Sequence, residues 1–114
     1  MVAVIFEVIV EPGERKEEYL SLAAQLKDEL KHIKGFISIE RFTSIYTENK
    51  ILSLSFWEDE DAVKSWRELS VHREAQKRGR QIFTDYRLRV AHVVRDYGMY
   101  KREETPEDSR LYHN

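Results

Sequence analysis

The stretch VAVIFEVIV, residues 2–10, decides the fold of this chain. It is rich in β-branched residues and is followed by Pro12 and Gly13, so it predicts a strand that ends in a turn. The strand is apolar on both faces, with Val4, Phe6 and Val8 on one and Ile5 and Ile9 on the other. Such a strand must be covered on both sides. One layer of helices covers only one face, so a second layer or a second molecule must cover the other.

The rest of the chain alternates between helical and strand patterns. Residues 14–34 carry apolar side chains at spacings of three and four, which predicts an amphipathic helix that ends near Gly35. Asp59 is placed to cap a second helix. The other predicted elements are strands over 36–45 and 51–57, a short helix over 71–81, and a long last strand within 82–97.

This order is β-α-β followed by a second β-α-β, which predicts an α+β, ferredoxin-like split arrangement. Right-handed crossovers would place the helices on one face of a four-stranded antiparallel sheet. We assign Ile5, Ile9, Phe42 and Trp57 to the uncovered face. Two such faces packed together predict a homodimer, a dimeric α+β barrel, with a small-molecule pocket between or beside the sheets. The domain is expected to span residues 1–100, followed by a polar tail over 101–114.

Composition limits the classes of function. The chain has 114 residues, 35% charged residues and a formal net charge of −2, which gives no electrostatic reason for a nucleic-acid partner. It contains no cysteine, so disulfides and thiolate sites are excluded. The apolar start lacks a basic leader and is too short to span a bilayer, so we expect a cytoplasmic protein without membrane attachment.

Four segments resemble the antibiotic biosynthesis monooxygenase domains, which are dimeric α+β barrels. They are VIFEV at 4–8, GFISIERF at 35–42, LSLSFWEDEDAVKSW at 52–66, and YRLRVAHVVRDYG at 86–98. The resemblance implies a cofactor-independent monooxygenase acting on a small phenolic or quinol-type aromatic. The haem-degrading branch carries an Asn on the first strand and a His ten residues after the helical Trp. Here Glu7 lies on that strand and Gln76 occupies the second position, so we expect no haem breakdown.

Two tryptophans and a histidine are the first candidates for a site. Trp66 lies on the apolar stripe of its helix, so it is either a core residue or a pocket wall on which a flat substrate could stack. Trp57 ends a strand and is expected to contact the dimer partner more than a ligand. His72 lies near the start of the short helix, where the dipole favours the neutral imidazole. It is either a capping residue or the base that takes a proton from the substrate.

The remaining candidates lie on the strands. Glu7 interrupts an apolar strand, so it should pair with Arg41, Arg87 or Arg89, or act as a second base in the pocket. By resemblance, Arg41 or Arg89 would stabilise a substrate anion. Tyr86 could offer its hydroxyl to a substrate carbonyl. His92 lies among valines and is expected to be buried, where it either bonds to the backbone or a carboxylate or contacts the substrate. No two histidines fall at a metal-ligand spacing, so no metal is expected.

Two alternatives belong to other classes of function. The first is a non-catalytic dimeric protein that binds small molecules or responds to stress, because a fold does not fix a function. The second is a haem-binding protein.

Overall fold

The computed structural model describes residues 1–69 and 83–109. The elements follow the predicted order, and the short helix predicted over 71–81 lies outside the described residues. The elements are β1 (Val2–Val10), α1 (Glu14–Leu30), β2 (Phe36–Thr43), β3 (Lys50–Trp57), α2 (Glu60–Arg67) and β4 (Phe83–His92).

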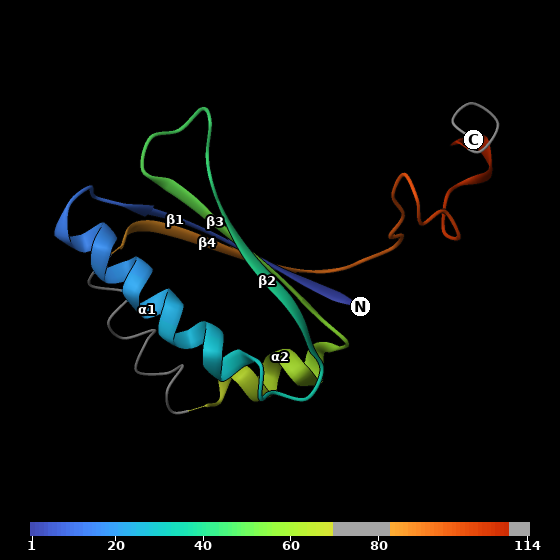
Figure 1. Cartoon of the computed structure of the whole chain (residues 1–114), viewed down its shortest axis with the longest axis horizontal. Coiled ribbons are helices and arrows are strands. Elements are labelled where there is room, and N and C mark those ends of the chain that lie inside the picture. The colour runs from blue at the N-terminus through green and yellow to red at the C-terminus, as the bar shows by residue number, and fades with distance from the viewer. Residues whose placement is uncertain (70–82, 110–114) are drawn as a thin grey trace.

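The four strands form one antiparallel sheet in the order β2-β3-β1-β4. Placing β3 between the two parallel strands β1 and β2 defines the split β-α-β arrangement. Both helices lie on the same side of the sheet, and the described chain places no helix on the other side (Figure 1). The predicted ferredoxin-like α+β fold is therefore confirmed.

The strand register shows which side chains face the helices. Directly opposite residues in an antiparallel pair point to the same face. Val2 lies opposite Trp57, and Val4 lies opposite Ser55. Trp57 is fully buried and packs with Val2 and Val4 in the helix-covered core. The sequence-based placement of Trp57 on the uncovered face, as a dimer contact, is therefore wrong.

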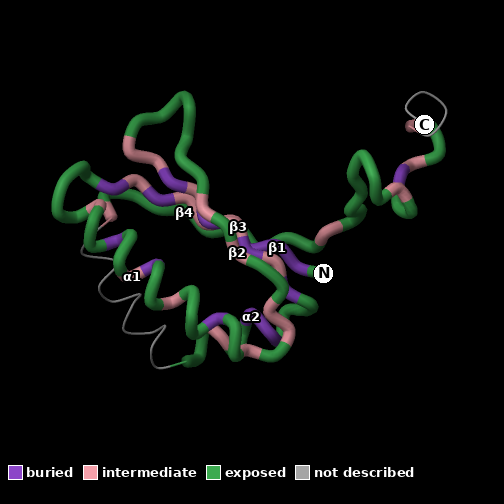
Figure 2. Tube along the Cα trace, viewed as in Figure 1, coloured by how far each residue is buried: buried purple, intermediate pink, exposed green. Residues whose placement is uncertain are grey.

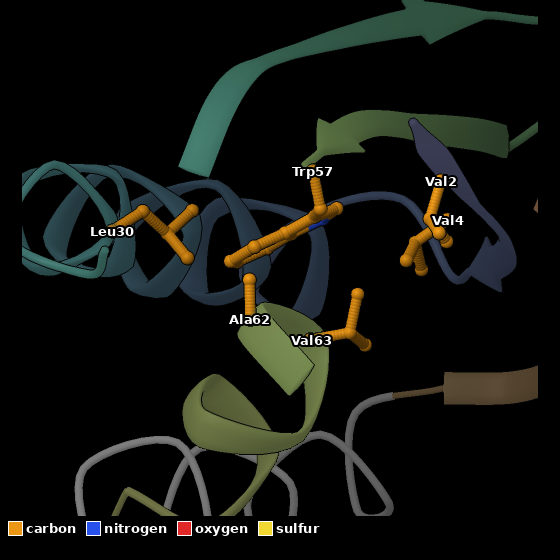
Figure 3. Packing of buried hydrophobic residues seen from close by; sticks show 6 residues of the cluster. All are labelled: Val2, Val4, Leu30, Trp57, Ala62 and Val63. Carbon is orange, nitrogen blue, oxygen red and sulfur yellow. The ribbon is translucent and has the colours of Figure 1, made fainter. Parts of the chain in front are cut away.

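The core consists of two clusters between the sheet and the helices. The larger one contains Val2, Val4, Leu30, Trp57, Ala62 and Val63. Figure 3 shows the Trp57 indole over Ala62 and Val63 of α2, with Leu30 of α1 at its edge. The smaller cluster contains Val8, Val10, Tyr19 and Ile51. Figure 2 shows the buried residues concentrated on the central strands and on the inner sides of the helices.

Two turns fix how the helices meet the sheet. Asp59 caps α2, since its Oδ1 accepts a hydrogen bond from the Ala62 backbone N–H at 2.9 Å, as the sequence predicts. Gly35 adopts a φ of 91° in the turn between α1 and β2. A Cβ at Gly35 would lie 2.6 Å from the Cβ of Ala62, so this turn packs directly on α2.

The uncovered face of the sheet, which we call the open face, carries a row of partly exposed apolar side chains. By the register these are Ile5, Ile9, Phe42, Leu52, Leu54 and Phe56. Beyond β4, residues 93–109 run away from the body of the domain (Figure 1). In the described chain, no helix is long and apolar enough to cross a membrane.

Candidate functional site

A cavity of about 190 Å³ lies between the sheet and the two helices. All six elements contribute described residues to its wall, and most of these residues are apolar. Val4 and Phe6 of β1 form the floor, and Leu22, Ala23 and Leu26 of α1 lie across from them. Its volume exceeds the roughly 150 Å³ of an engineered apolar cavity that holds benzene. It can therefore hold a small, mostly apolar molecule.

One end of the cavity is lined by aromatic rings. The ring centroid of Phe83 lies 5.7 Å from that of Phe6 and 5.4 Å from that of Tyr19, both in edge-to-face geometry. Tyr86 completes the group at 5.9 Å from Phe6. Edge-to-face pairs at these distances are favourable beyond the area that they bury. This aromatic cluster of Phe6, Tyr19, Phe83 and Tyr86 forms one end of the cavity from rings that pack against one another.

Trp66 forms another part of the wall, and Trp57 lies behind it. The two indoles are stacked, with centroids 5.3 Å apart and planes 22° from parallel. Trp57 is fixed in turn, because its Nε1 donates a hydrogen bond of 2.9 Å to the Ser55 hydroxyl. Trp66 is partly buried, packs against the larger core cluster and also lines the cavity. Its two predicted roles, core residue and pocket wall, are thus compatible.

The polar side chains of the wall gather toward β2 and β3. Arg41 lies directly opposite Ser53 across these two strands, and both line the cavity. The Nε of Arg41 is buried and has no hydrogen-bond partner within the described residues. Arg67 of α2 adds a second guanidinium from an exposed position. The described lining residues include no Asp and no Glu.

The other predicted site residues are distributed over both faces of the sheet. Tyr86 lines the cavity and is 53% exposed. Glu7 lies on the open face, where one carboxylate oxygen is 3.5 Å from Arg89 and 3.7 Å from Lys50. The expected ion pair of Glu7 with Arg89 is confirmed. Neither residue is among the described residues that line the cavity, so we assign them no role in its chemistry.

The two histidine predictions have different outcomes. The His92 side chain is 75% exposed and lies 3.5 Å from a carboxylate oxygen of Glu60. The expectation that His92 is buried is therefore wrong, because it lies at the end of an edge strand, where the sheet has no further neighbour to cover it. His72 lies outside the described residues.

Several residues of the cavity were not found from the sequence. Arg67, Ser53, Tyr19 and Phe83 all line it. The two serines of β3 were the available signal, because Ser53 and Ser55 alternate with large apolar residues yet share the face of Trp57. Small polar residues on a core-facing strand leave room for a ligand.

The comparisons with known proteins agree with this architecture. The family model of antibiotic biosynthesis monooxygenases matches residues 1–78. The chain belongs to this family. A relative named jasmonate monooxygenase ABM, from Pyricularia oryzae, is 44% identical over 95 residues, which are 82% of this chain. These residues span only 44% of that relative, so the chain corresponds to less than half of its length.

Solved structures of the family share the fold at low sequence identity. A putative antibiotic biosynthesis monooxygenase from Deinococcus radiodurans superposes with a TM-score of 0.77 at 12% identity, covering 86% of this chain and 97% of that one. SnoaB, a cofactor-independent oxygenase from Streptomyces nogalater, gives a TM-score of 0.73 at 16% identity, with 83% and 94% covered. At these identities the likeness establishes the fold alone.

Proposed function

We propose that this member of the family is a monooxygenase that oxidises a small aromatic molecule with O₂, without a bound cofactor, in the cavity beside Trp66. The observation that carries the proposal is the cavity itself, which is mostly apolar and has an indole in its wall. An apolar pocket with few polar groups is the usual form of a small-molecule site. The family membership and the name of the Pyricularia relative support oxygenation as the reaction class.

The proposed substrate is a phenol or quinol. A deprotonated phenol can give an electron to O₂, which leaves a phenoxyl radical and superoxide. These two radicals can combine to form a new carbon–oxygen bond on the ring. Loss of water then leaves a quinone: one oxygen atom enters the product and the other leaves as water, so no external reductant is needed. Trp66 and the aromatic cluster would hold the ring in position for the reaction. His72 is the proposed base.

Oxygen uptake by the purified full chain tests this proposal. A panel of phenols and quinols, with jasmonate as a non-phenolic member, should include at least one compound that is consumed with O₂. With ¹⁸O₂, one labelled oxygen should appear in the product. If compounds bind but no member of the panel is oxidised, the chain is a small-molecule-binding protein and the proposal fails.

We also propose that the chain forms a homodimer through the open face. This face has no helical layer in the described chain, and its apolar side chains flank the ion pairs of Glu7 with Lys50 and Arg89. A second copy related by a twofold axis would cover the same residues on both molecules. Such an arrangement is the dimeric α+β barrel expected from the sequence.

A further inference from the structure

The cavity has a polarity gradient that the proposed oxygenation does not explain. One row of side chains crosses the helix-facing side of all four strands, in the order Arg41, Ser53, Phe6, Leu88. All four residues line the cavity. Adjacent strands lie about 4.8 Å apart, so the row is about 14 Å long. It begins with a cation on one edge strand and ends with an aliphatic side chain on the other.

Within the described residues, no carboxylate balances the positive charge at the polar end of the cavity. Arg41 and Arg67 are the charged residues among the described lining of the cavity, and both are cations. Within residues 1–69 and 83–109, neither has a carboxylate in ion-pair contact. The buried Nε of Arg41 also has no hydrogen-bond acceptor there. A buried donor that is left unpaired is unfavourable, and a charged one more so.

We infer that the cavity binds an amphipathic monocarboxylate, with the carboxylate on Arg41 and the apolar body extending toward the aromatic cluster of Phe6, Tyr19, Phe83 and Tyr86. The inference rests on the proposed function only in taking this cavity as the substrate site. It adds that the substrate carries an acid group separate from the part that is oxidised.

The chemistry of arginine favours a carboxylate over other groups. The Nε and one terminal nitrogen of a guanidinium present two parallel N–H donors, which match the two oxygens of a carboxylate. A neutral phenol offers one oxygen and no charge at neutral pH, because its pKa is about 10. The Ser53 hydroxyl lies opposite Arg41 and can donate a further hydrogen bond to the same oxygens.

Three probes of nearly the same size test the inference by binding measurements alone. They are 3-phenylpropanoate, its uncharged amide 3-phenylpropanamide, and 4-propylphenol. Binding is followed by calorimetry and by tryptophan fluorescence, because Trp66 borders the cavity. The carboxylate should bind roughly tenfold to a hundredfold more tightly than the amide, as expected for a charge-assisted pair. The phenol should bind no more tightly than the amide.

Variants then assign the preference to one residue. Arg41→Gln should bring the carboxylate down to the affinity of the amide and leave the amide unchanged. Arg41→Lys keeps the positive charge but not the two parallel N–H donors, so it should retain part of the preference for the carboxylate. Arg95→Gln removes the same charge from an exposed position beyond β4, so it should behave as the parent protein. Circular dichroism melts show whether each variant is folded. If Arg41→Gln does not fold, the comparison is made with Arg41→Lys.

The inference would be overturned by equal binding of acid and amide, by a carboxylate preference that survives in Arg41→Gln, or by binding of none of the probes at millimolar concentration. Tighter binding of the phenol would assign Arg41 to a phenolic oxygen instead and would also overturn it. These results do not depend on turnover. If the protein consumes oxygen with a panel compound but shows no preference for the carboxylate, the proposed function stands and the inference fails. If it prefers the carboxylate but consumes no oxygen, the inference stands and the proposed function fails.

Discussion

Trp66 shows how one residue can belong to the core and to the cavity at once. It stacks on Trp57 and packs against the larger core cluster, yet it is only partly buried because the cavity lies beside it. Atoms that face a void have fewer packing partners, so they contribute less to stability. Position 66 should therefore tolerate truncation better than position 57.

Trp66→Ala should lower the free energy of unfolding by about 2 kcal/mol, below the usual range for a fully packed aromatic ring. Trp57→Ala is the matched control, because its ring is fully buried, and it should cost roughly 3–5 kcal/mol. Urea denaturation measures both. Equal losses for the two variants would mean that Trp66 is an ordinary core residue and that the cavity does not reach it.

Gly35→Ala should be among the most damaging single-methyl changes in this chain. Its φ of 91° disfavours any side chain, and the new Cβ would meet Ala62 at 2.6 Å. Together these effects should cost roughly 2–4 kcal/mol in a denaturation experiment. Gly13 has a similar φ of 96° with nothing within 4 Å of a new Cβ, so Gly13→Ala should show only the backbone part, about 1–3 kcal/mol. Equal costs would show that the contact with α2 relaxes freely.

At the level of elements, the strands and helices follow directly from the sequence. The apolar period of residues 14–34, the cap at Asp59 and the β-branched run of β1 are local signals, and each predicted its element, although α1 itself ends at Leu30. Side chains alternate between the two faces of a strand, so Ser53, Ser55 and Trp57 share one face of β3. Which face receives the helices depends on packing between distant segments, so the assignment of Trp57 failed.

The site was harder to predict from the sequence than the elements were, because it also depends on packing between segments that are distant in the chain. Arg41, Trp66 and Tyr86 were named from the sequence, and all three line the cavity. Glu7 and Arg89 were named with them but lie on the other face of the sheet, where they pair with each other. A one-residue difference in strand position moves a side chain to the opposite face. Sequence patterns identify such residues without showing which of them meet.

Asp59→Ala should destabilise α2 and, through it, the wall that holds Trp66. The lost cap hydrogen bond predicts a decrease of about 1 kcal/mol in the free energy of unfolding. Asp59→Asn keeps a hydrogen-bond acceptor at the same place, so it should retain most of the stability that Asp59→Ala loses. Asp61→Ala removes an acidic residue from the same first turn without removing the cap, and should cost less. Thermal melts of the three variants would contradict this account if Asp61→Ala were the most damaging.

For the whole molecule, the open face is the main surface that the described chain leaves without a covering layer. The chain also has a radius of gyration of 16.4 Å, against about 13 Å for a compact domain of this length, because residues 93–109 extend from the body. This segment exposes Val94, Met99 and Tyr100. The apolar side chains of the open face are explained if the proposed second copy covers them.

Leu54→Asp should convert the proposed dimer to a monomer, because it places a charge in the middle of the open face, where burial would be costly. Leu20→Asp is the control, since Leu20 is exposed on α1, away from this face. Light scattering at micromolar concentration should give a dimer mass for the parent and for Leu20→Asp, and a monomer mass for Leu54→Asp. A monomeric parent protein would remove the barrel from the account.

We propose that the substrate is oxidised in the cavity between the sheet and the helices. Ala23 lines this cavity from α1, while its neighbour Ala24 is exposed on the same helix. Ala23→Leu fills the space with a good helix former, and Ala24→Leu adds the same atoms outside it. The deciding measurement is the rate of oxygen uptake by both variants with the most active compound of the panel. We expect a loss of at least about tenfold for Ala23→Leu, since even a 1.4 kcal/mol penalty on binding the reacting molecule has this effect, and no loss for Ala24→Leu. An unchanged rate in a folded Ala23→Leu variant would contradict the proposal.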